Sequence, residues 1–208
     1  MVAKHYTSEN VVARGVTFEA YMQDFAADFA EWVQGDVIKM SPVTVEHDGL
    51  FQFIIRLLRD YLDETDEGIL RVAPFVMKIT PSSPAREPDL QIILKERTDI
   101  VERTMTAGAA DIVIEIVSEE SEARDTETKF AEYQAGGVRE YWLLNPLNKA
   151  SGFYRLNNDG VYELVELADG IFHSAVLPRF QLDTRLLWQS PLPNGKQITA
   201  LVDAMLNM

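Results

Sequence analysis

The chain has 208 residues, enough for one domain that buries roughly 70% of its unfolded surface without crosslinks. Its 33 acidic and 19 basic residues give a net charge of −14, which argues against a protein that binds nucleic acid through a broad basic surface. The absence of cysteine excludes disulfides and thiolate zinc sites. No stretch approaches the ~18 apolar residues of a membrane helix, and no signal peptide is evident, so we expect a cytoplasmic protein without membrane contact.

The first third of the chain predicts a tail, a short helix, a hairpin and a long helix. We expect residues 1–15 to form a flexible tail and residues 16–208 a single domain. Thr17 is a suitable N-cap for a short helix. Residues 32–40 predict a hairpin, because β-branched and aromatic residues flank a glycine-containing turn. After Ser41-Pro42, apolar residues at helical spacing predict a helix of about 20 residues.

The middle of the chain predicts buried strands. A long strand over residues 69–79 leads into a loop over 80–87 that is rich in proline and serine. A buried strand follows over 88–94, and a short surface helix over 98–105 separates it from a second buried strand over 112–117.

Each of the two buried strands has one acidic residue. Glu115 is the one charged side chain in an aliphatic run, and a buried carboxylate costs several kcal/mol, roughly, unless it is paired. Asp89 stands at the entrance of the other strand. If these strands are neighbours, both carboxylates point into one cleft, where a divalent cation is their natural partner.

A capped region after Ser118 predicts a helix from about residue 121 to 135, with Lys129 beside its apolar side. Residues 171–190 give no clear pattern. The remaining expected elements are a strand, a hairpin and a terminal helix at residues 139–144, 151–167 and 197–206. This order indicates an α/β domain with a mixed sheet, helices packed on it and added antiparallel hairpins.

Several short motifs occur in a characteristic order between residues 16 and 190. They are Thr17–Tyr21, Gly35–Pro42, Glu46-His47, Val72–Phe75, Pro88–Leu90, Ile114–Ser118, Lys129 and Tyr133–Trp142. This ordered set resembles the PD-(D/E)XK nuclease superfamily, and in detail its Uma-type restriction endonuclease branch, long catalogued as a domain of unknown function. The resemblance implies a restriction-endonuclease-like fold.

The superfamily pattern has a lysine two residues after the glutamate, where this chain has Val117. The resemblance implies that Lys129, on the following helix, replaces that lysine, because its long stem can reach the same space. The implied catalytic residues are Asp89, Glu115 and Lys129. The implied ligands of Mg²⁺, or Mn²⁺, are Asp89, Glu115, Glu46 and the backbone carbonyl of Ile116. Further candidates for contact with the substrate are His47, Gln91, Arg86 and Arg124.

Each of these candidates also has a structural explanation. The helix dipole favours an acid such as Glu46 in a first turn. His47 fits a hydrogen-bonded histidine at the edge of the core. Lys129 can form an i, i+4 ion pair with Asp125. For the arginines, an ordinary surface position is the default.

The resemblance implies a Mg²⁺-dependent endonuclease that hydrolyses phosphodiester bonds in DNA. A homodimer would supply two active sites for two strands. Two alternatives stay open: a nuclease-fold binding or regulatory module without turnover, and an unrelated acidic α/β domain whose carboxylates are paired. Motifs of serine hydrolases, phosphate-binding loops and zinc metalloproteases are missing from the sequence.

Overall fold

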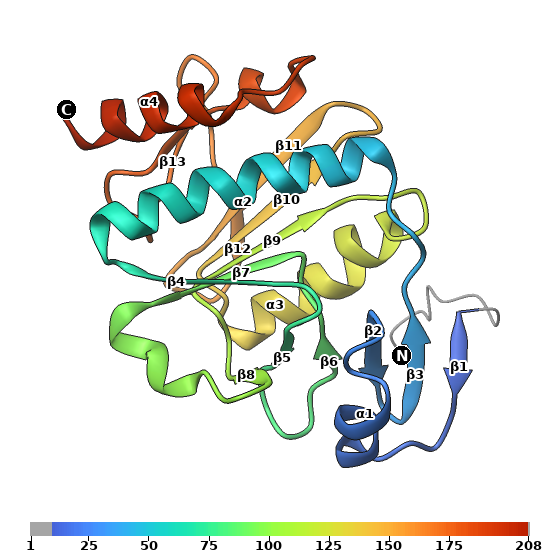
Figure 1. The fold of residues 1–208 in the computed structure, drawn as a ribbon. Coiled ribbons are helices and arrows are strands. Elements are labelled where there is room, and N and C mark those ends of the chain that lie inside the picture. Colours follow the sequence, from blue (N-terminus) through green and yellow to red (C-terminus); the bar gives the residue numbers. More distant parts are fainter. Residues whose placement is uncertain (1–9, 208) are drawn as a thin grey trace.

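The computed structural model describes residues 10–207 and contains two mixed six-stranded sheets (Figure 1). The sheet under the longest helix is called the central sheet here. Its strands, in spatial order, are β12 (Tyr162–Leu164), β11 (Ala150–Leu156), β10 (Glu140–Asn145), β9 (Ile112–Ile116), β7 (Leu90–Leu94) and β4 (Gly68–Val72). β9 and β10 run parallel and the other neighbours antiparallel. The expected α/β class with a mixed sheet is therefore confirmed.

The second six-stranded sheet, called the N-terminal sheet, is built mainly from the first part of the chain. Its strands, in spatial order, are β1 (Val11–Ala13), β3 (Asp36–Lys39), β2 (Ala30–Val33), β6 (Ala85–Arg86), β5 (Val76–Lys78) and β8 (Met105–Ala107). β1 pairs with β3, so the prediction of a tail is wrong for residues 11–13. The part of that predicted tail over residues 1–9 lies outside the described residues.

Helices cover both faces of the central sheet (Figure 1). The α-helices are α1 (Phe18–Asp24), α2 (Val45–Thr65), α3 (Phe130–Gly136) and α4 (Gly195–Leu206). Helix α2 begins after its N-cap Thr44, as the helical spacing predicts, and α4 lies beside it. The short helix capped by Thr17 and the hairpin β2–β3 are also confirmed. Within the described residues, no helix is both long and apolar enough to cross a membrane.

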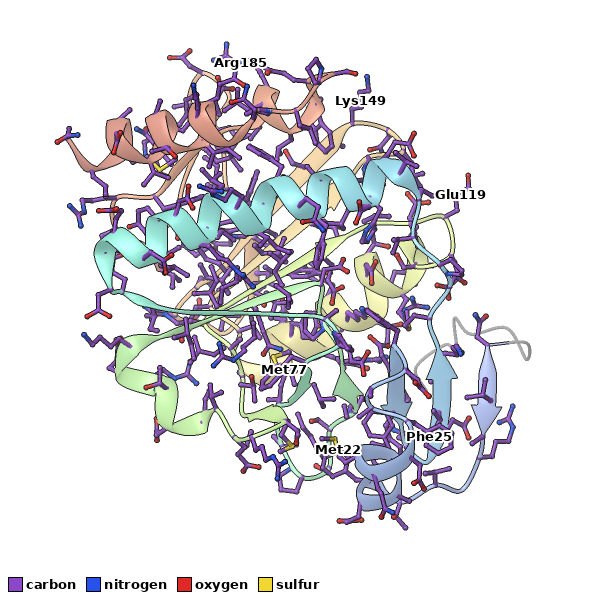
Figure 2. The ribbon with its side chains drawn as sticks, viewed as in Figure 1. Met22, Phe25, Met77, Glu119, Lys149 and Arg185 are labelled. Atoms are coloured by element: carbon purple, nitrogen blue, oxygen red, sulfur yellow. The ribbon has the colours of Figure 1, made fainter. Side chains whose placement is uncertain are left out.

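Strand alternation divides the core between two faces of the central sheet. Ile112 and Ile114 pack in a cluster with Leu57 of α2 and Val202 of α4. The opposite face carries Val113, and its cluster includes side chains of α3 and of β5, such as Met77, labelled in Figure 2. Glu115 shares the alternation of Val113, so the sheet directs it toward α3.

The expected strand over residues 69–79 is two strands, β4 and β5, and each belongs to a different sheet. Pro74 lies between them, and a proline has no N–H to donate to a sheet ladder. The expected loop over 80–87 contains the short strand β6. The expected helix over 98–105 lies earlier, as a 3₁₀ helix η1 (Lys95–Ile100).

The C-terminal third follows the predicted order. β10 and the hairpin β11–β12 form as expected. Residues 171–190, which had no clear pattern, contain the two-stranded sheet of β13 (Ile171–His173) and β14 (Gln181–Asp183) and the 3₁₀ helix η3 (Thr184–Trp188). The helix expected over 121–135 has a π-helical segment, η2 (Arg124–Lys129), before α3.

Candidate functional site

A cleft with a volume of about 740 Å³ lies at the N-terminal end of α2, between that helix, the end of β9 and the π-helix. Asp89, Glu115, Ile116 and Lys129 all line it. The cleft therefore brings Asp89, Glu115 and Lys129 together with Ile116, whose backbone carbonyl the resemblance implies as a ligand.

Asp89 is placed by the pairing of β7 with β9. These strands are antiparallel neighbours with Leu90 opposite Ile114, so Asp89 comes next to the end of β9, as predicted. Its Oδ2 accepts a hydrogen bond from the backbone N–H of Ile116 at 2.7 Å. The same oxygen lies 3.4 Å from Nε2 of His47. Strand register and a histidine of α2 thus orient this carboxylate.

His47 is a buried residue of the first turn of α2 and lines the cleft. Burial lowers the pKa of His47, but the hydrogen bond and charge of Asp89 outweigh it and raise the pKa above 6.5. Its Nδ1 has no hydrogen-bond partner among the described residues. His47 therefore connects α2 to Asp89.

Glu115 is nearly inaccessible, and its Oε1 accepts two hydrogen bonds. Nζ of Lys129 donates at 3.0 Å and the hydroxyl of Tyr133 donates at 2.7 Å. Burial raises the pKa of Glu115 to about 8, because the charge of Lys129 only partly offsets the lost hydration. Nearby Asp125 and Asp89 raise it further. A carboxylate in this position gains from any additional positive charge.

Lys129 is surrounded by three carboxylates. Its Nζ lies 3.0 Å from Glu115, 3.1 Å from Glu31 and 3.3 Å from Asp125. Burial lowers the pKa of Lys129, yet the three acids outweigh burial and hold it well above 10.5. Lys129 is therefore an ammonium with a fixed position at the wall of the cleft.

The π-helical segment explains how Lys129 and its neighbours reach the cleft. Arg124, Asp125, Thr128 and Lys129 are all buried along this segment. A π-helix widens the turn and is often found at functional sites. Its wider turn is the local geometry that presents both Asp125 and Lys129 to the end of β9.

The cleft includes His47 and Arg124 from the further candidates, and leaves out Gln91 and Arg86. Arg124 donates two hydrogen bonds to Glu120, at 2.7 and 3.1 Å. Gln91 is buried on β7, where it donates to the carbonyl of Phe75 and accepts from Thr106. Neither of those contacts involves the cleft.

Arg86 and Glu46 also lie away from the cleft lining. Arg86 donates to Glu31 and Glu132 and borders a separate hollow of about 300 Å³. Glu46 is exposed on the first turn of α2, where its position agrees with a dipole-favoured acid. The residue after it, His47, occupies the side of the helix that faces Asp89.

Sequence reasoning missed two buried acids next to this cluster. Glu31 lies on β2 between apolar neighbours, the same signal that identified Glu115. Glu87 lines the cleft and accepts a hydrogen bond from the hydroxyl of Tyr21 at 3.2 Å. Its Oε2 has no hydrogen-bond partner among the described residues. Burial raises the pKa of Glu87 to about 8, and the charge of Glu31 contributes to this increase.

The donors in the cleft fit a hard divalent cation. Mg²⁺ commonly takes one or two carboxylates, with water or phosphate oxygens in its other positions. Asp89, Glu115 and the carbonyl of Ile116 would offer such a set, and the pKa of Glu115, which burial and then the nearby acids raise, shows that its carboxylate lacks full compensation. Between residues 10 and 207, no group of three or more Asp, Glu or His side chains is arranged to hold a metal ion by itself.

Comparisons with known proteins agree with this architecture. A solved structure of a putative nuclease belonging to DUF820 from Anabaena variabilis ATCC 29413 is similar in fold, with a TM-score of 0.58 and 15% sequence identity. The match covers 83% of this chain and 90% of that one. None of the curated proteins matches the sequence. The family model Uma2, described as "Putative restriction endonuclease", matches residues 17–185. Because that match spans most of the chain, the protein belongs to the Uma2 family.

Proposed function

We propose that this protein is an endonuclease that hydrolyses phosphodiester bonds in DNA and depends on Mg²⁺ or Mn²⁺. The observation that carries the proposal is that Asp89, Glu115 and Lys129, two carboxylates and an ammonium, share one cleft. This combination suits the transfer of a phosphoryl group to water. The description of the Uma2 family as restriction endonucleases supports the proposal.

The two carboxylates and the carbonyl of Ile116 would hold the cation. A bound Mg²⁺ would supply polarisation of the phosphate and activation of a water molecule. The Ile116 N–H and His47 orient Asp89, while the hydroxyl of Tyr133 orients Glu115. These contacts reduce the freedom of both carboxylates before the substrate arrives.

Lys129 would stabilise the charge that develops on the phosphate. Its pKa is held well above 10.5 by the surrounding acids, so it acts as a fixed positive charge rather than as a base. Arg124, which is anchored to Glu120, is a second cation at the cleft wall.

A supercoiled-plasmid nicking assay tests this function. We expect nicking with Mg²⁺ or Mn²⁺, none with EDTA, and a loss of at least about 100-fold in Asp89→Asn and Glu115→Gln. Asp111→Asn is the matched control, because Asp111 is a buried acid at the opposite end of β9 and outside the cleft. Its nicking rate should stay within about twofold of the wild type.

Wild-type cleavage no faster than that of Asp89→Asn would contradict the proposal. If cleavage is absent, calorimetric titration with Mn²⁺ distinguishes a regulatory module from an acidic α/β domain whose carboxylates are merely paired. Cation and DNA binding without cleavage would favour a regulatory module, and the excess of acids over cations in the cleft is the feature that favours that alternative.

A homodimer is part of the proposal, because two active sites commonly cut the two strands of a duplex and twofold homodimers are the commonest assembly. Sedimentation velocity, with and without a DNA duplex, measures it. A strictly monomeric protein that still makes double-strand breaks would contradict it.

A further inference from the structure

Glu31 reaches the reactive cluster from the N-terminal sheet, whereas Glu115 belongs to the central sheet. The Oε1 of Glu31 lies 3.1 Å from Nζ of Lys129, and the side chain of Glu31 is completely buried. Glu31 is absent from the residues that line the cleft. It therefore contacts the amine from behind and has no direct access to a substrate or a cation in the cleft.

The position of Glu31 is fixed by Arg86. The Nη1 of Arg86 donates to Oε2 of Glu31 at 2.7 Å. The same guanidinium makes a two-pronged contact with Glu132, at 2.8 and 2.7 Å. Strand pairing supports this arrangement, since Trp32, the residue after Glu31, lies opposite Ala85, the residue before Arg86. Strand pairing thus fixes the backbone near Glu31, and Arg86 fixes its carboxylate.

The ionised form of Glu31 follows from the same neighbours. Burial alone raises the pKa of Glu31, but the charges of Lys129 and Arg86 outweigh burial and lower it to about 2. Glu31 and Lys129 are therefore a permanently charged, buried pair. Removal of one member of such a pair leaves the other charge without compensation.

Of the three carboxylates around Lys129, Glu115 and Asp125 line the cleft and Glu31 does not, and Glu115 has a second task in the proposed function. A cation held by Glu115 weakens the attraction between that carboxylate and the ammonium. We infer that Glu31 is a positioning residue that holds the Lys129 ammonium at the cleft wall while Glu115 binds the cation. The inference rests on the proposed nuclease function, and it assigns Arg86 the task of fixing Glu31.

Steady-state cleavage kinetics of Glu31→Gln test this role. Glutamine keeps the shape and can still accept from Arg86, but it lacks the charge that holds Lys129. We expect kcat to fall at least about tenfold while KM for DNA stays within about threefold, since a positioning residue acts on the transition state. Asp111→Asn removes another completely buried acid, which pairs with Arg97 at 2.8 Å, and should leave kcat within about twofold.

A second readout does not require cleavage. The proton–nitrogen NMR signal of the Lys129 ammonium is assigned by its loss in Lys129→Met. We expect this signal in the wild type and in Asp111→Asn, and its loss or broadening in Glu31→Gln. If the wild type fails to cleave DNA, the proposed function fails, and this signal alone decides whether Glu31 holds Lys129.

The inference is overturned if Glu31→Gln keeps a kcat within twofold of the wild type, if Asp111→Asn loses as much, or if the ammonium signal is unchanged. If Glu31→Gln fails to fold, Arg86→Lys is measured in its place. The single amine of a lysine cannot contact both Glu31 and Glu132 as the arginine guanidinium does. A loss in kcat of about threefold or more at constant KM is then expected, and no loss overturns the inference.

Discussion

The surroundings of Glu87 favour the neutral, protonated form of its carboxyl group. It is buried beside the cleft, it accepts from Tyr21, and one of its oxygens has no hydrogen-bond partner among the described residues. Tyr21 also donates to the carbonyl of Ala30 at 2.6 Å, so the hydroxyl is shared. A neutral carboxyl at this point lowers the negative charge around Lys129 and Asp89.

The pKa of Glu87 predicts a loss of stability as the pH rises. The folded-state pKa is about 8 and the usual value is 4.5, so the folded protein holds this proton more tightly than the unfolded chain. Stability from this group is full below pH 4.5 and declines until about pH 8. We expect Glu87→Gln to be nearly neutral at about pH 4 and to stabilise the folded protein by roughly 3–5 kcal/mol at about pH 8.5.

Urea unfolding in EDTA at these two pH values measures the difference. Glu115 has a raised pKa of the same size, so the wild type and the variant both retain the slope of Glu115, and only their difference reports on Glu87. A difference that does not change with pH would show that Glu87 is already ionised in the folded protein.

At the scale of elements, sequence patterns predicted the helices, turns and strands that depend on short segments of the chain. The apolar spacing of α2, the Asp159-Gly160 turn of the β11–β12 hairpin and the aliphatic run of β9 are properties of short segments. The π-helix was beyond such reasoning, because Asp125 and Lys129 within it contact residues far away in sequence, such as Tyr141 and Glu115. Glu31 lies between apolar residues as Glu115 does, but its contacts with Arg86 and Lys129, which are far away in sequence, could not be predicted.

The edge pairing of β4 with β7 depends on a glycine. A Cβ at Gly68 would lie 2.5 Å from the carbonyl oxygen of Ile93 and 3.1 Å from Cα of Leu94, both backbone atoms that cannot turn away. We expect Gly68→Ala to destabilise the fold by about 1–3 kcal/mol.

Gly195→Ala is the control for this prediction. Gly195 is the first residue of α4, and a Cβ there would have no neighbour closer than 3.9 Å. Its replacement should be neutral or stabilise by up to about 1 kcal/mol. Denaturant unfolding of both variants provides the comparison, and equal effects would contradict the role given to Gly68.

At the scale of the whole molecule, charge limits how DNA can bind. The chain carries a net charge of −14, and the few cations that line the cleft include Lys39, Arg124 and Lys129. Arg124 and Lys129 already pair with acids. DNA therefore has few free positive groups to meet, and the bound cation must supply much of the attraction for phosphate.

This balance predicts a shallow salt dependence. With one or two phosphates neutralised, the Kd of Asp89→Asn for a DNA duplex should rise only roughly 3- to 12-fold between about 50 and 200 mM salt. Lys39→Ala should reduce the slope by about one unit. Arg185→Ala is the control, since Arg185 lies near α4 in Figure 2, is mostly exposed and is not part of the cleft. A steep slope in fluorescence anisotropy would contradict this prediction.

The short run from β6 into β7 carries Arg86, Glu87 and Asp89, and it crosses from one sheet to the other within a few residues. One sheet holds the counter-ion behind the amine, and the other holds the acids in front of it. A relative in which the strands before α2 were trimmed or replaced could keep Asp89, Glu115 and Lys129 and still lose Glu31, the scaffold behind its amine. Surveys of such relatives should therefore read the opening strands before they infer activity from the motif.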